Sequence, residues 1–337
     1  MVFHCRCFSF SLQENEEIEY ETITQTNSTM TETFHTACSD FSLSVSNFHS
    51  KTTEFPNLAE KPSNLRVFTV AELKAATKNF CGEYKLGEGG FGSVYKGVVK
   101  SLEYPFHEVQ VAVKYADGEP HASGDHKLLL VYEYMHNRSV RDYLSSQSKT
   151  PLSWNRRLKV AQGAARGLTY LHEDMDFQIV FRDFKSSNIL LDDGWNAKLS
   201  DFGLARLGPR QGLTHITTMF AGTMTYAAPE YIETGHLSTK CDVWSYGVFL
   251  FELITGRPPL DKNRPRNEKK LLEWVKPYPD IKRLRLIIDS RLEGNHSIKS
   301  ALKLSYIASR CLSKDPKLRP NMSEVLEMVN QLISVPS

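Results

Sequence analysis

The sequence lacks the features that mark several large classes of protein. No stretch reaches the ~18 consecutive apolar residues of a membrane-spanning helix, because the longest apolar run, residues 243–254, is interrupted by Ser245, Tyr246, Gly247 and Glu252. The six cysteines have no zinc-ligand spacing, and a chain of 337 residues is too long to depend on a disulfide framework. No basic stripe with interleaved aromatic residues indicates nucleic-acid binding. What remains is a globular chain suited to a reducing compartment.

Net charge is small but unevenly distributed. The chain carries +2 overall, yet residues 1–60 contain nine acidic and two basic residues, so the rest of the chain is basic. Residues 1–62 are also rich in Ser, Thr and Glu without a sustained hydrophobic period, and we expect a disordered tail there. Residues 262–270 and 282–285 are basic, which indicates either solvated surface or a contact with a membrane or partner.

The first ten residues, MVFHCRCFSF, differ from the rest of this tail. Cys5 and Cys7 lie among three phenylalanines, a pattern that indicates either S-acylation with the aromatic rings inserted shallowly in a bilayer, or an unmodified terminus. One acyl chain holds a protein to a membrane weakly, so both thiols would be needed. Residue 2 is Val rather than Gly, which excludes N-myristoylation.

Hydrophobic periodicity changes from strand-like to helical along the chain. Residues 63–79 form a helical lead-in, where the capping box from Thr69 to Glu72 predicts a helix over Val70–Asn79. Strands are predicted by alternation and by glycine-separated β-rich flanks, in the hairpin 85–99 and at 108–115 and 128–135. Helical periods follow at 154–173, 240–256 and 301–334. Strands before helices predict an α+β fold, with a small β-rich lobe at 80–135 and a larger helical lobe at 136–334.

The segment VFRDFKSSNILLDDGWNAKLSDFG, residues 180–203, carries the clearest chemical signal in the chain. Asp183, Lys185, Asn188 and Asp201 have the spacing of a phosphoryl-transfer site. One carboxylate accepts the proton of an attacking hydroxyl, the lysine reaches the transferring phosphate, and an amide with a second carboxylate holds magnesium. The alternative is a polar loop between two strands, but such a loop would not need these residue types at so many set spacings.

A family resemblance follows from six segments that occur in a fixed order. GEGGFGSV, VAVK, FRDFKSSN, SDFG, AAPE and DVWSYG resemble the eukaryotic protein kinases over residues 80–334. LLVYEYM, AARGLTYLHE, GLARLGP and ELITGRPPLDKNRPRNEKKLLEW resemble the plant receptor-like cytoplasmic kinases, subfamily VII-like and related to the interleukin-receptor-associated kinases. The resemblance implies a two-lobed protein kinase fold and transfer of the γ-phosphate of ATP to protein Ser or Thr, with Mg²⁺.

The glycine-rich segment, residues 87–92, is a weak signal when taken alone. It lies between two strands rather than between a strand and a helix, which disfavours dinucleotide binding. The resemblance implies that its backbone closes over the phosphates, that apolar side chains enclose the adenine, that backbone groups near the end of the last strand bind its edge, and that a lysine contacts the α- and β-phosphates. The residues implied are Leu86, Gly87, Glu88, Gly89, Gly90, Phe91, Gly92, Val94, Ala112, Lys114, Glu133, Met135 and Leu190.

The resemblance also assigns roles around the 180–203 segment. Asp183 is the base or positions the hydroxyl, Lys185 favours Ser/Thr specificity, and Asn188 and Asp201 bind magnesium. Arg182 would bind a phosphate on the activation segment, 201–230. The candidate phosphosites there are Thr217 and Thr218, followed by Thr214.

Further residues are expected to act structurally. Thr223 would support the catalytic loop, Glu230 and Arg319 would form a buried ion pair, and Asp242 would anchor the loop. The family usually has His before the Arg-Asp pair, where this chain has Phe181, which we expect to pack near Phe202. The catalytic roles that the resemblance implies belong to Asp183, Lys185 and Lys114.

One segment departs from the family pattern. Only the thirteen residues YADGEPHASGDHK separate Lys114 from Leu128, where the family has a long helix and a further strand. That helix supplies a glutamate that pairs with the lysine, and neither Glu119 nor Glu108 lies in a helical pattern. Three interpretations remain open: an active kinase whose predicted gene model dropped an exon, a nucleotide-binding pseudokinase that acts as a scaffold, or a non-functional product.

The resemblance implies a cellular setting as well. We expect protein substrates, a membrane receptor kinase complex as partner, and a role in immune or developmental signalling. The location expected is cytoplasmic and peripheral at the plasma membrane, without nucleic-acid binding.

Overall fold

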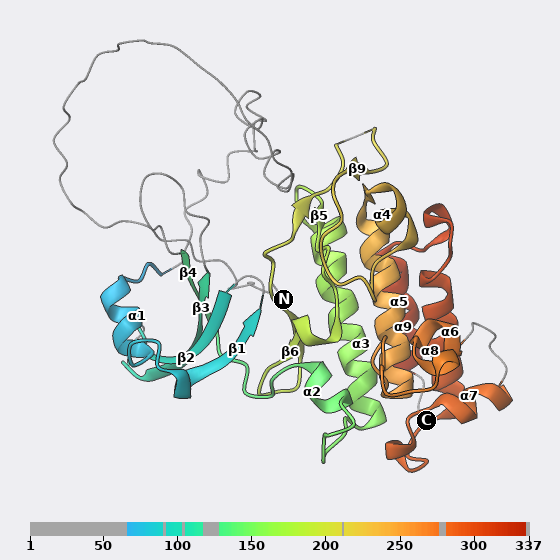
Figure 1. Ribbon diagram of the computed structural model, residues 1–337, viewed down its shortest axis with the longest axis horizontal. Helices are drawn as coiled ribbons and strands as arrows, with labels where there is room; N and C mark the ends of the chain where they lie inside the picture. The colour runs from blue at the N-terminus through green and yellow to red at the C-terminus, as the bar shows by residue number, and fades with distance from the viewer. Residues whose placement is uncertain are drawn as a thin grey trace, which may run out of the picture. The chain divides into compact units, whose positions relative to one another are not determined.

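The computed structural model describes residues 66–89, 92–102, 105–116, 128–210, 212–275 and 281–334. It divides into two compact units, the sheet unit up to Glu133 and the helical unit from Tyr134 (Figure 1). The predicted tail of residues 1–62, with its candidate acylation site at Cys5 and Cys7, lies outside the described residues. Gly90 and Phe91 of the glycine-rich segment also lie outside them.

Four antiparallel strands form the sheet unit, in the order in which they occur along the chain (Figure 1). The hairpin predicted at residues 85–99 is present, with Gly89 opposite Gly92 at its turn. The strands are β1 (Lys85–Gly89), β2 (Gly92–Lys100), β3 (Glu108–Ala116) and β4 (Leu128–Glu133), preceded by the 3₁₀ turn η2 (Gly82–Tyr84).

Alternation along β3 gives the sheet two different faces. Val111 and Val113 are buried against Leu73 of helix α1 (Val70–Ala76) and form the small core of this unit. Gly97 on β2 permits the close approach of the helix, because a Cβ there would lie only 3.5 Å from the Cβ of Ala76 at the end of α1.

The opposite face of the sheet carries Lys114. This lysine is the register partner of Val94 on β2 and of Leu130 on β4, so the three side chains share that face. Ala112, two residues before Lys114, points the same way. In the described part of the sheet unit α1 is the only α-helix, and it packs on the other face.

Helix α1 begins where the sequence predicts and ends earlier. Thr69 Oγ1 accepts a hydrogen bond from Glu72 N at 3.2 Å, and Glu72 Oε2 accepts one from Thr69 N at 2.7 Å, which completes the capping box. The predicted end at Asn79 is wrong. The helix stops at Ala76, because residues 78–80 have positive φ values of 50°, 57° and 54°.

A short connection joins β3 to β4. The two strands pair directly, from Val111 opposite Glu133 to Ala116 opposite Leu128. Residues 117–127 between them lie outside the described residues, so the expected lack of the family's helix and extra strand stays a prediction. The pairing shows that β3 and β4 are neighbours in a continuous sheet.

Long helices dominate the helical unit, and its short strands pair in two-stranded ribbons (Figure 1). The helix predicted at 240–256 is α5, and the periodic stretch 301–334 is two helices, α8 and α9. The α-helices are α2 (Val140–Leu144), α3 (Trp154–Thr169), α4 (Pro229–Thr234), α5 (Thr239–Thr255), α6 (Leu271–Val275), α7 (Ile281–Ile287), α8 (Ile298–Cys311) and α9 (Met322–Ser334). The strands are β5 (Ile179–Val180), β6 (Ile189–Leu191), β7 (Ala197–Leu199), β8 (Arg206–Leu207), β9 (Ile216–Thr217) and β10 (His236–Leu237). Single turns are η3 (Tyr170–Asp174), η4 (Ser186–Asn188), η5 (Arg266–Glu268), η6 (Ser290–Leu292) and η7 (Pro316–Leu318).

Helix α5 is the centre of the helical core, and its middle residues are buried on all sides. The sequence predicts such a buried core helix from the apolar run at residues 243–254. Tyr246 Oη donates to Ala161 O of α3 at 2.9 Å. Gly247 lets α8 approach, because a Cβ there would lie 2.9 Å from the Cβ of Cys311. The core therefore fixes α5 against the two helices that flank it.

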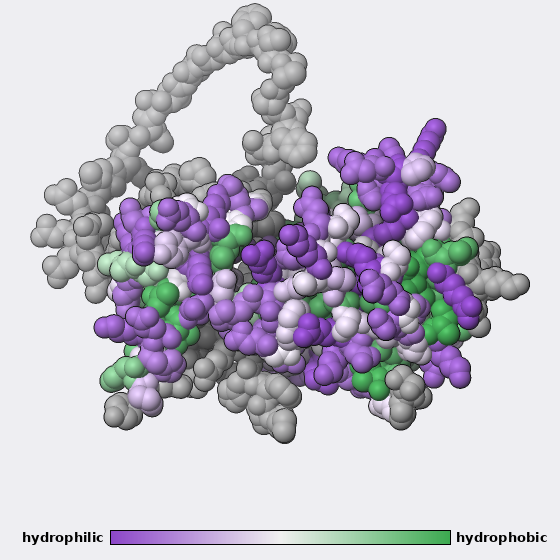
Figure 2. Space-filling model, turned by 90° about the horizontal axis from the view of Figure 1, so that it is seen from below, coloured by the Kyte–Doolittle hydropathy of each residue, from purple (hydrophilic) through white to green (hydrophobic). Residues whose placement is uncertain are grey.

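The surface shows no large apolar face in the view of Figure 2, which is mostly hydrophilic with separate hydrophobic patches. Scattered exposed apolar side chains of this kind are ordinary on a water-exposed surface. Among the residues that the structure describes, no helix combines the length and the apolar character needed to cross a membrane.

Candidate active site

A short β-ribbon sets the positions of two predicted site residues. Strands β6 and β7 pair with Ile189 opposite Leu199, so Asn188, just before β6, and Asp201, just after β7, are at the same end of the ribbon. Ser200 closes this end, because its backbone N and its Oγ donate to Asn188 O at 2.9 and 3.1 Å. The ribbon therefore places Asn188 and Asp201 at the same end, with Ser200 bonded to Asn188.

The carboxylate of Asp183 is buried and held by three side chains. Its Oδ1 accepts from Thr223 Oγ1 at 2.7 Å, and its Oδ2 accepts from Lys185 Nζ at 2.6 Å and from Asn188 Nδ2 at 3.3 Å. Lys185 Nζ also donates to Thr223 Oγ1 at 3.0 Å. The carboxylate is thus fixed in one geometry. Among the described residues Oδ1 has a single donor, which leaves it a lone pair for a hydroxyl.

Asp242 on α5 holds the backbone that leads into Asp183. Its Oδ2 accepts from Phe181 N at 2.7 Å and from His172 Nε2 at 2.8 Å, and its Oδ1 accepts from Arg182 N at 2.8 Å. Arg182 has a φ of 73°, which is uncommon for a residue with a side chain. The buried carboxylate of Asp242 therefore stabilises a turn that costs backbone strain.

Phe181 gives the loop an aromatic anchor in place of the family's usual histidine. It is fully buried, with its ring 5.0 Å from that of Phe202 and 6.3 Å from that of Phe184, both edge to face. The packing expected from the sequence is present. Phe181 thus joins the catalytic loop to the residue directly after Asp201.

The side chain of Arg182 reaches the activation segment, where Nη2 donates to Met219 O at 2.6 Å. The residue before Met219 is Thr218, which is half-buried, while Thr214 and Thr217 are exposed. The guanidinium group therefore lies beside the segment that carries all three candidate phosphosites. In this structure its bonds go to a carbonyl and to a tyrosine hydroxyl.

The ion pair expected between Glu230 and Arg319 is present and bidentate. Arg319 Nη1 lies 2.6 Å from Glu230 Oε1, and Nη2 lies 2.8 Å from Oε2. The guanidinium group is buried, donates also to Ser313 O at 2.8 Å, and stacks on the Trp244 ring at 4.9 Å. The pair joins the end of the activation segment to the turn before α9.

In the sheet unit, β2 and β3 bring Val94, Ala112 and Lys114 onto one face. Gly87 and Gly89 on β1 have open space around them, because a Cβ at either position would meet nothing within 4 Å. Leu86 and Glu88 also lie on β1, Gly92 begins β2 and Glu133 ends β4, whereas Met135 and Leu190 belong to the helical unit. The two units thus each hold part of the predicted nucleotide-binding set.

A buried cluster beneath the catalytic loop was missed at the level of sequence. Tyr226 Oη donates to Glu252 Oε2 at 2.5 Å, and Ser186 Oγ donates to Glu252 Oε1 at 3.1 Å. Burial raises the pKa of Glu252 to about 8, against the opposing effect of these two hydrogen bonds. Burial and the nearby Glu252 carboxyl also raise the pKa of Tyr226 well above its ordinary value. The available signal was an acidic residue inside the apolar run of α5.

The residues that would hold a metal ion fit that task. Both hydrogen bonds of Asn188 Nδ2 go to Asp183, one to its backbone O at 3.0 Å and one to its Oδ2 at 3.3 Å. These bonds use the amide nitrogen of Asn188 and leave its amide oxygen as an acceptor for a cation. An amide oxygen and a carboxylate are the hard ligands that divalent cations such as Mg²⁺ prefer.

This arrangement is that of the protein kinases, and the comparison with known families agrees. The model of the protein kinase domain matches residues 113–329. The match covers more than half of the chain, so the chain belongs to the protein kinase family. It begins at Val113 inside β3, and the glycine-rich segment lies before it. Members of this family use ATP and a divalent metal ion.

Similar curated proteins assign the chain to a narrower group within the protein kinase family. Serine/threonine-protein kinase PCRK1 of Arabidopsis thaliana is 54% identical over 317 residues, covering 84% of this chain and 75% of the relative. PCRK2 of the same plant is 52% identical over 313 residues, covering 83% and 74%. An EPD1-interacting receptor-like cytoplasmic serine/threonine-protein kinase of Nicotiana benthamiana is 44% identical over 306 residues, covering 81% and 66%. The chain is accordingly a serine/threonine protein kinase of the receptor-like cytoplasmic group.

Proposed function

We propose that this chain transfers the γ-phosphate of ATP to Ser or Thr hydroxyls of other proteins through the cluster centred on Asp183. The observation that carries the proposal is the set of hydrogen bonds that joins Asp183 to Lys185, Thr223 and Asn188. These bonds lie within the helical unit, so the arrangement is formed before any substrate arrives. Preorganised polar groups of this kind lower a barrier without reorganising during the reaction.

Each member of the cluster has a separate task. Asp183 Oδ1 accepts a hydrogen bond from the substrate hydroxyl and takes its proton as the oxygen attacks the γ-phosphorus. The new O–P bond forms as the bond to the β-phosphate oxygen breaks, and ADP leaves. The Lys185 ammonium, held 2.6 Å from Asp183 Oδ2, is placed to stabilise charge on the phosphoryl oxygens. Thr223 is hydrogen-bonded to both Asp183 and Lys185 and so holds these two side chains in position.

The remaining predicted residues would bind the nucleotide and its metal. Asn188 and Asp201 would hold magnesium, which neutralises phosphate charge when bound. On the sheet unit, Lys114 would contact the α- and β-phosphates, with Val94 and Ala112 beside the adenine. The support for this set is the shared sheet face described above.

A second candidate function is that of a nucleotide-binding scaffold with weak transfer. The observation that favours it is the short span between Lys114 and Leu128, thirteen residues where the family has a long helix and a further strand. The relatives support a real difference in length: the alignment with PCRK1 extends over 317 residues but takes in 84% of the 337 residues of this chain. The relative thus has residues within the aligned region that this chain lacks.

The cellular setting belongs to the same proposal. The chain would be cytoplasmic and peripheral at the plasma membrane, in a complex with a membrane receptor kinase, and would act in immune or developmental signalling. The relatives' classification as receptor-like cytoplasmic kinases supports this setting. Acylation at Cys5 and Cys7 would supply the anchor, and a double Cys→Ser variant that stays at the membrane would refute it.

The test of the catalytic proposal is phosphate transfer from γ-labelled ATP to a generic protein substrate, followed by identification of the labelled amino acid. We expect label on Ser and Thr, dependent on Mg²⁺. Asp183→Asn should lower the rate by roughly 10²- to 10⁴-fold, the range for loss of a positioned acid–base group. The matched control is Asp193→Asn, since that exposed carboxylate pairs with His136 outside the cluster.

Two outcomes decide between the candidates. Transfer by the chain well above that of Asp183→Asn supports the kinase and excludes the scaffold. Transfer no higher than that of Asp183→Asn, together with Mg²⁺-dependent ATP binding, supports the scaffold.

A further inference from the structure

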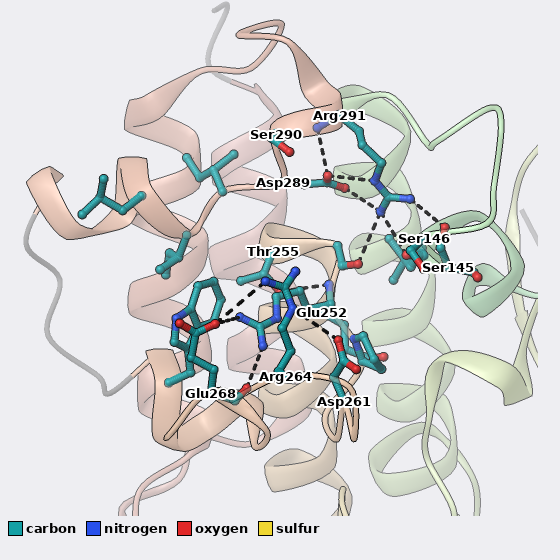
Figure 3. Close-up of a pocket in the computed structure, with 18 of the residues that line it drawn as sticks. Ser145, Ser146, Glu252, Thr255, Asp261, Arg264, Glu268, Asp289, Ser290 and Arg291 are labelled. Carbon is teal, nitrogen blue, oxygen red and sulfur yellow. Dashed lines mark hydrogen bonds and ion pairs between the residues drawn. The ribbon is translucent and has the colours of Figure 1, made fainter. Parts of the chain in front are cut away.

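The helical unit contains a cavity of about 930 Å³ on the other side of Glu252 from the catalytic loop. It is lined by residues of α2, of the C-terminal end of α5 and of the segments that follow α5 and α7 (Figure 3). Arg141, Arg257, Arg264 and Arg291 all line it. None of these arginines takes part in the catalytic arrangement, so the cavity calls for a separate explanation.

The charge of the lining is positive once the partners of each group are counted. Asp289 is shared between Arg291 and the buried Arg157, which lies behind it. Burial holds the pKa of Glu252 at about 8, so this carboxyl is mostly protonated at pH 7. Asp261 and Glu268 therefore remain as the carboxylates that face the other arginines (Figure 3). A cavity with an excess of guanidinium groups favours an anionic ligand.

Arg257 is the buried member of the set, and its hydrogen-bonding capacity is only partly used. Its side chain stacks on the Trp274 ring at 3.9 Å, and Nη2 donates to Glu268 O at 2.6 Å. Nη1 lies 3.6 Å from Glu268 Oε2, which is beyond a direct hydrogen bond. Nε is buried and has no hydrogen-bond partner among the described residues. Unsatisfied buried donors are rare and call for an explanation.

Arg264 faces the same carboxylate from the solvent side. Its Nη1 lies 3.9 Å from Glu268 Oε2 and its Nε lies 3.5 Å from Asp261 Oδ2, so both contacts are long (Figure 3). Half of the Arg264 side chain is exposed. Two guanidinium groups thus share Glu268 through long contacts, which leaves both able to donate to a phosphate, a group with three strong acceptor oxygens and about two negative charges.

The rim of the cavity adds an apolar contact and more positive charge. Leu286 lines the cavity and is 81% exposed, although it is a large apolar residue. The basic segment 262–270 contains η5 and contributes Arg264 and Glu268 to the lining. A phosphorylated residue next to an apolar one in an extended protein segment would meet both features.

We infer that this cavity is a docking site for a phosphorylated Ser or Thr of a partner protein, separate from the site of phosphate transfer. Arg257 and Arg264 bind the phosphate, Arg141 contributes from α2, and Leu286 packs against a neighbouring apolar side chain. A phosphorylated segment is favoured over a membrane surface because Arg257 is nine-tenths buried, at a depth that a planar surface does not reach.

The test measures binding to the full chain without nucleotide, so its result does not depend on catalysis. The probe is a fluorescein-labelled degenerate peptide pool with one fixed phosphothreonine, compared with the same pool unphosphorylated, with inorganic phosphate as competitor. We expect the phosphorylated pool to bind about tenfold more tightly, the effect of one charge-assisted bond. Arg264→Gln and Arg141→Gln should each weaken it about tenfold. Both side chains are exposed, so neither change should disturb the fold.

Controls assign the binding to this cavity. Arg166→Gln removes an exposed arginine of α3 that does not line the cavity, and should leave the affinity unchanged. Equal affinity for the two pools would overturn the inference. Binding that is lost in Arg182→Gln but kept in Arg264→Gln would place the phosphate at the activation segment and would also overturn it. So would binding of phosphatidylserine vesicles, but not of the peptide pool, with the same dependence on Arg264.

Discussion

The two units differ in how much of their predicted site they hold in place. In the helical unit, the carboxylate of Asp183 is fixed by Lys185, Thr223 and Asn188. The backbone just before Asp183 is held by Asp242 of α5, a long helix that is mostly buried. In the sheet unit, Lys114 lies on a sheet whose buried core is Leu73, Val111 and Val113. Under the proposed function, the transfer chemistry belongs to the helical unit, while nucleotide positioning depends on the unit with the smaller core.

Breaking the Glu230–Arg319 pair should have the largest effect on stability. Glu230→Gln leaves the guanidinium group of Arg319 buried without its carboxylate, which costs about 3–5 kcal/mol in comparable buried pairs. Urea unfolding measures the loss. The contrast is Glu88→Gln in the sheet unit, which breaks the exposed pair with Lys85 and should leave the midpoint unchanged. Equal losses in the two variants would contradict the comparison.

The pH dependence of stability should report on Glu252. Its pKa is raised to about 8 in the folded chain, above the ordinary value of 4.5. The folded state therefore binds more protons than the unfolded state between these values, and this group's contribution to stability falls as the pH rises from about 4.5 to 8. Glu252→Gln should remove a decline of a few kcal/mol over that window.

The measurement is urea unfolding of the two proteins at several pH values. Glu273→Gln is the control, because that carboxylate is exposed and pairs with Lys270 on the surface. Parallel curves for wild type and Glu252→Gln would show that burial does not hold a proton on Glu252.

Asp242→Asn should separate loop geometry from chemistry. The amide can still accept one hydrogen bond, so one of the two backbone N–H groups, of Phe181 or Arg182, loses its partner. We expect a loss of about 1–3 kcal/mol in the free energy of unfolding, together with slower phosphate transfer and an unchanged affinity for ATP. Slower transfer without a change in stability would mean that Asp242 acts in the chemistry itself.

The smallest effect is expected from a Val→Ala change that creates a cavity in the core of each unit. Val113→Ala in the sheet and Val248→Ala in α5 each remove the same atoms from a fully buried site, at about 2 kcal/mol. Native-state hydrogen exchange should show faster exchange in β2–β4 for the first variant and in α3, α5 and α8 for the second. Faster exchange across the whole chain in both variants would show that the units unfold as one.

Much of the fold was predictable because burial imposes simple periods. Alternation in β3 placed Val111 and Val113 opposite Lys114, and the structure agrees. The helix at 240–256 is largely buried and was found within one residue. The end of α1 was not predictable, because it depends on three consecutive residues with positive φ, and none of Lys78, Asn79 and Phe80 is a glycine.

The candidate site, like the fold, could be predicted from the sequence only in part. Motif spacing identified Asp183, Lys185 and Asn188, which the structure brings together. Glu252 could not be assigned a partner, because its contacts with Ser186 and Tyr226 join segments far apart in the chain. The arginine-lined cavity was likewise beyond sequence reasoning, since it combines α2, the end of α5 and the region after α7.

The central claim is that the helical unit carries a complete transfer site, limited only by how the sheet unit presents the nucleotide. The most direct test replaces residues 115–127 with the corresponding segment of PCRK1 and measures phosphate transfer from ATP beside the chain as it stands. We predict that the replacement raises the rate and that Asp183→Asn abolishes the gain. A repaired protein with no Mg²⁺-dependent transfer, or with transfer that survives Asp183→Asn, would contradict the account.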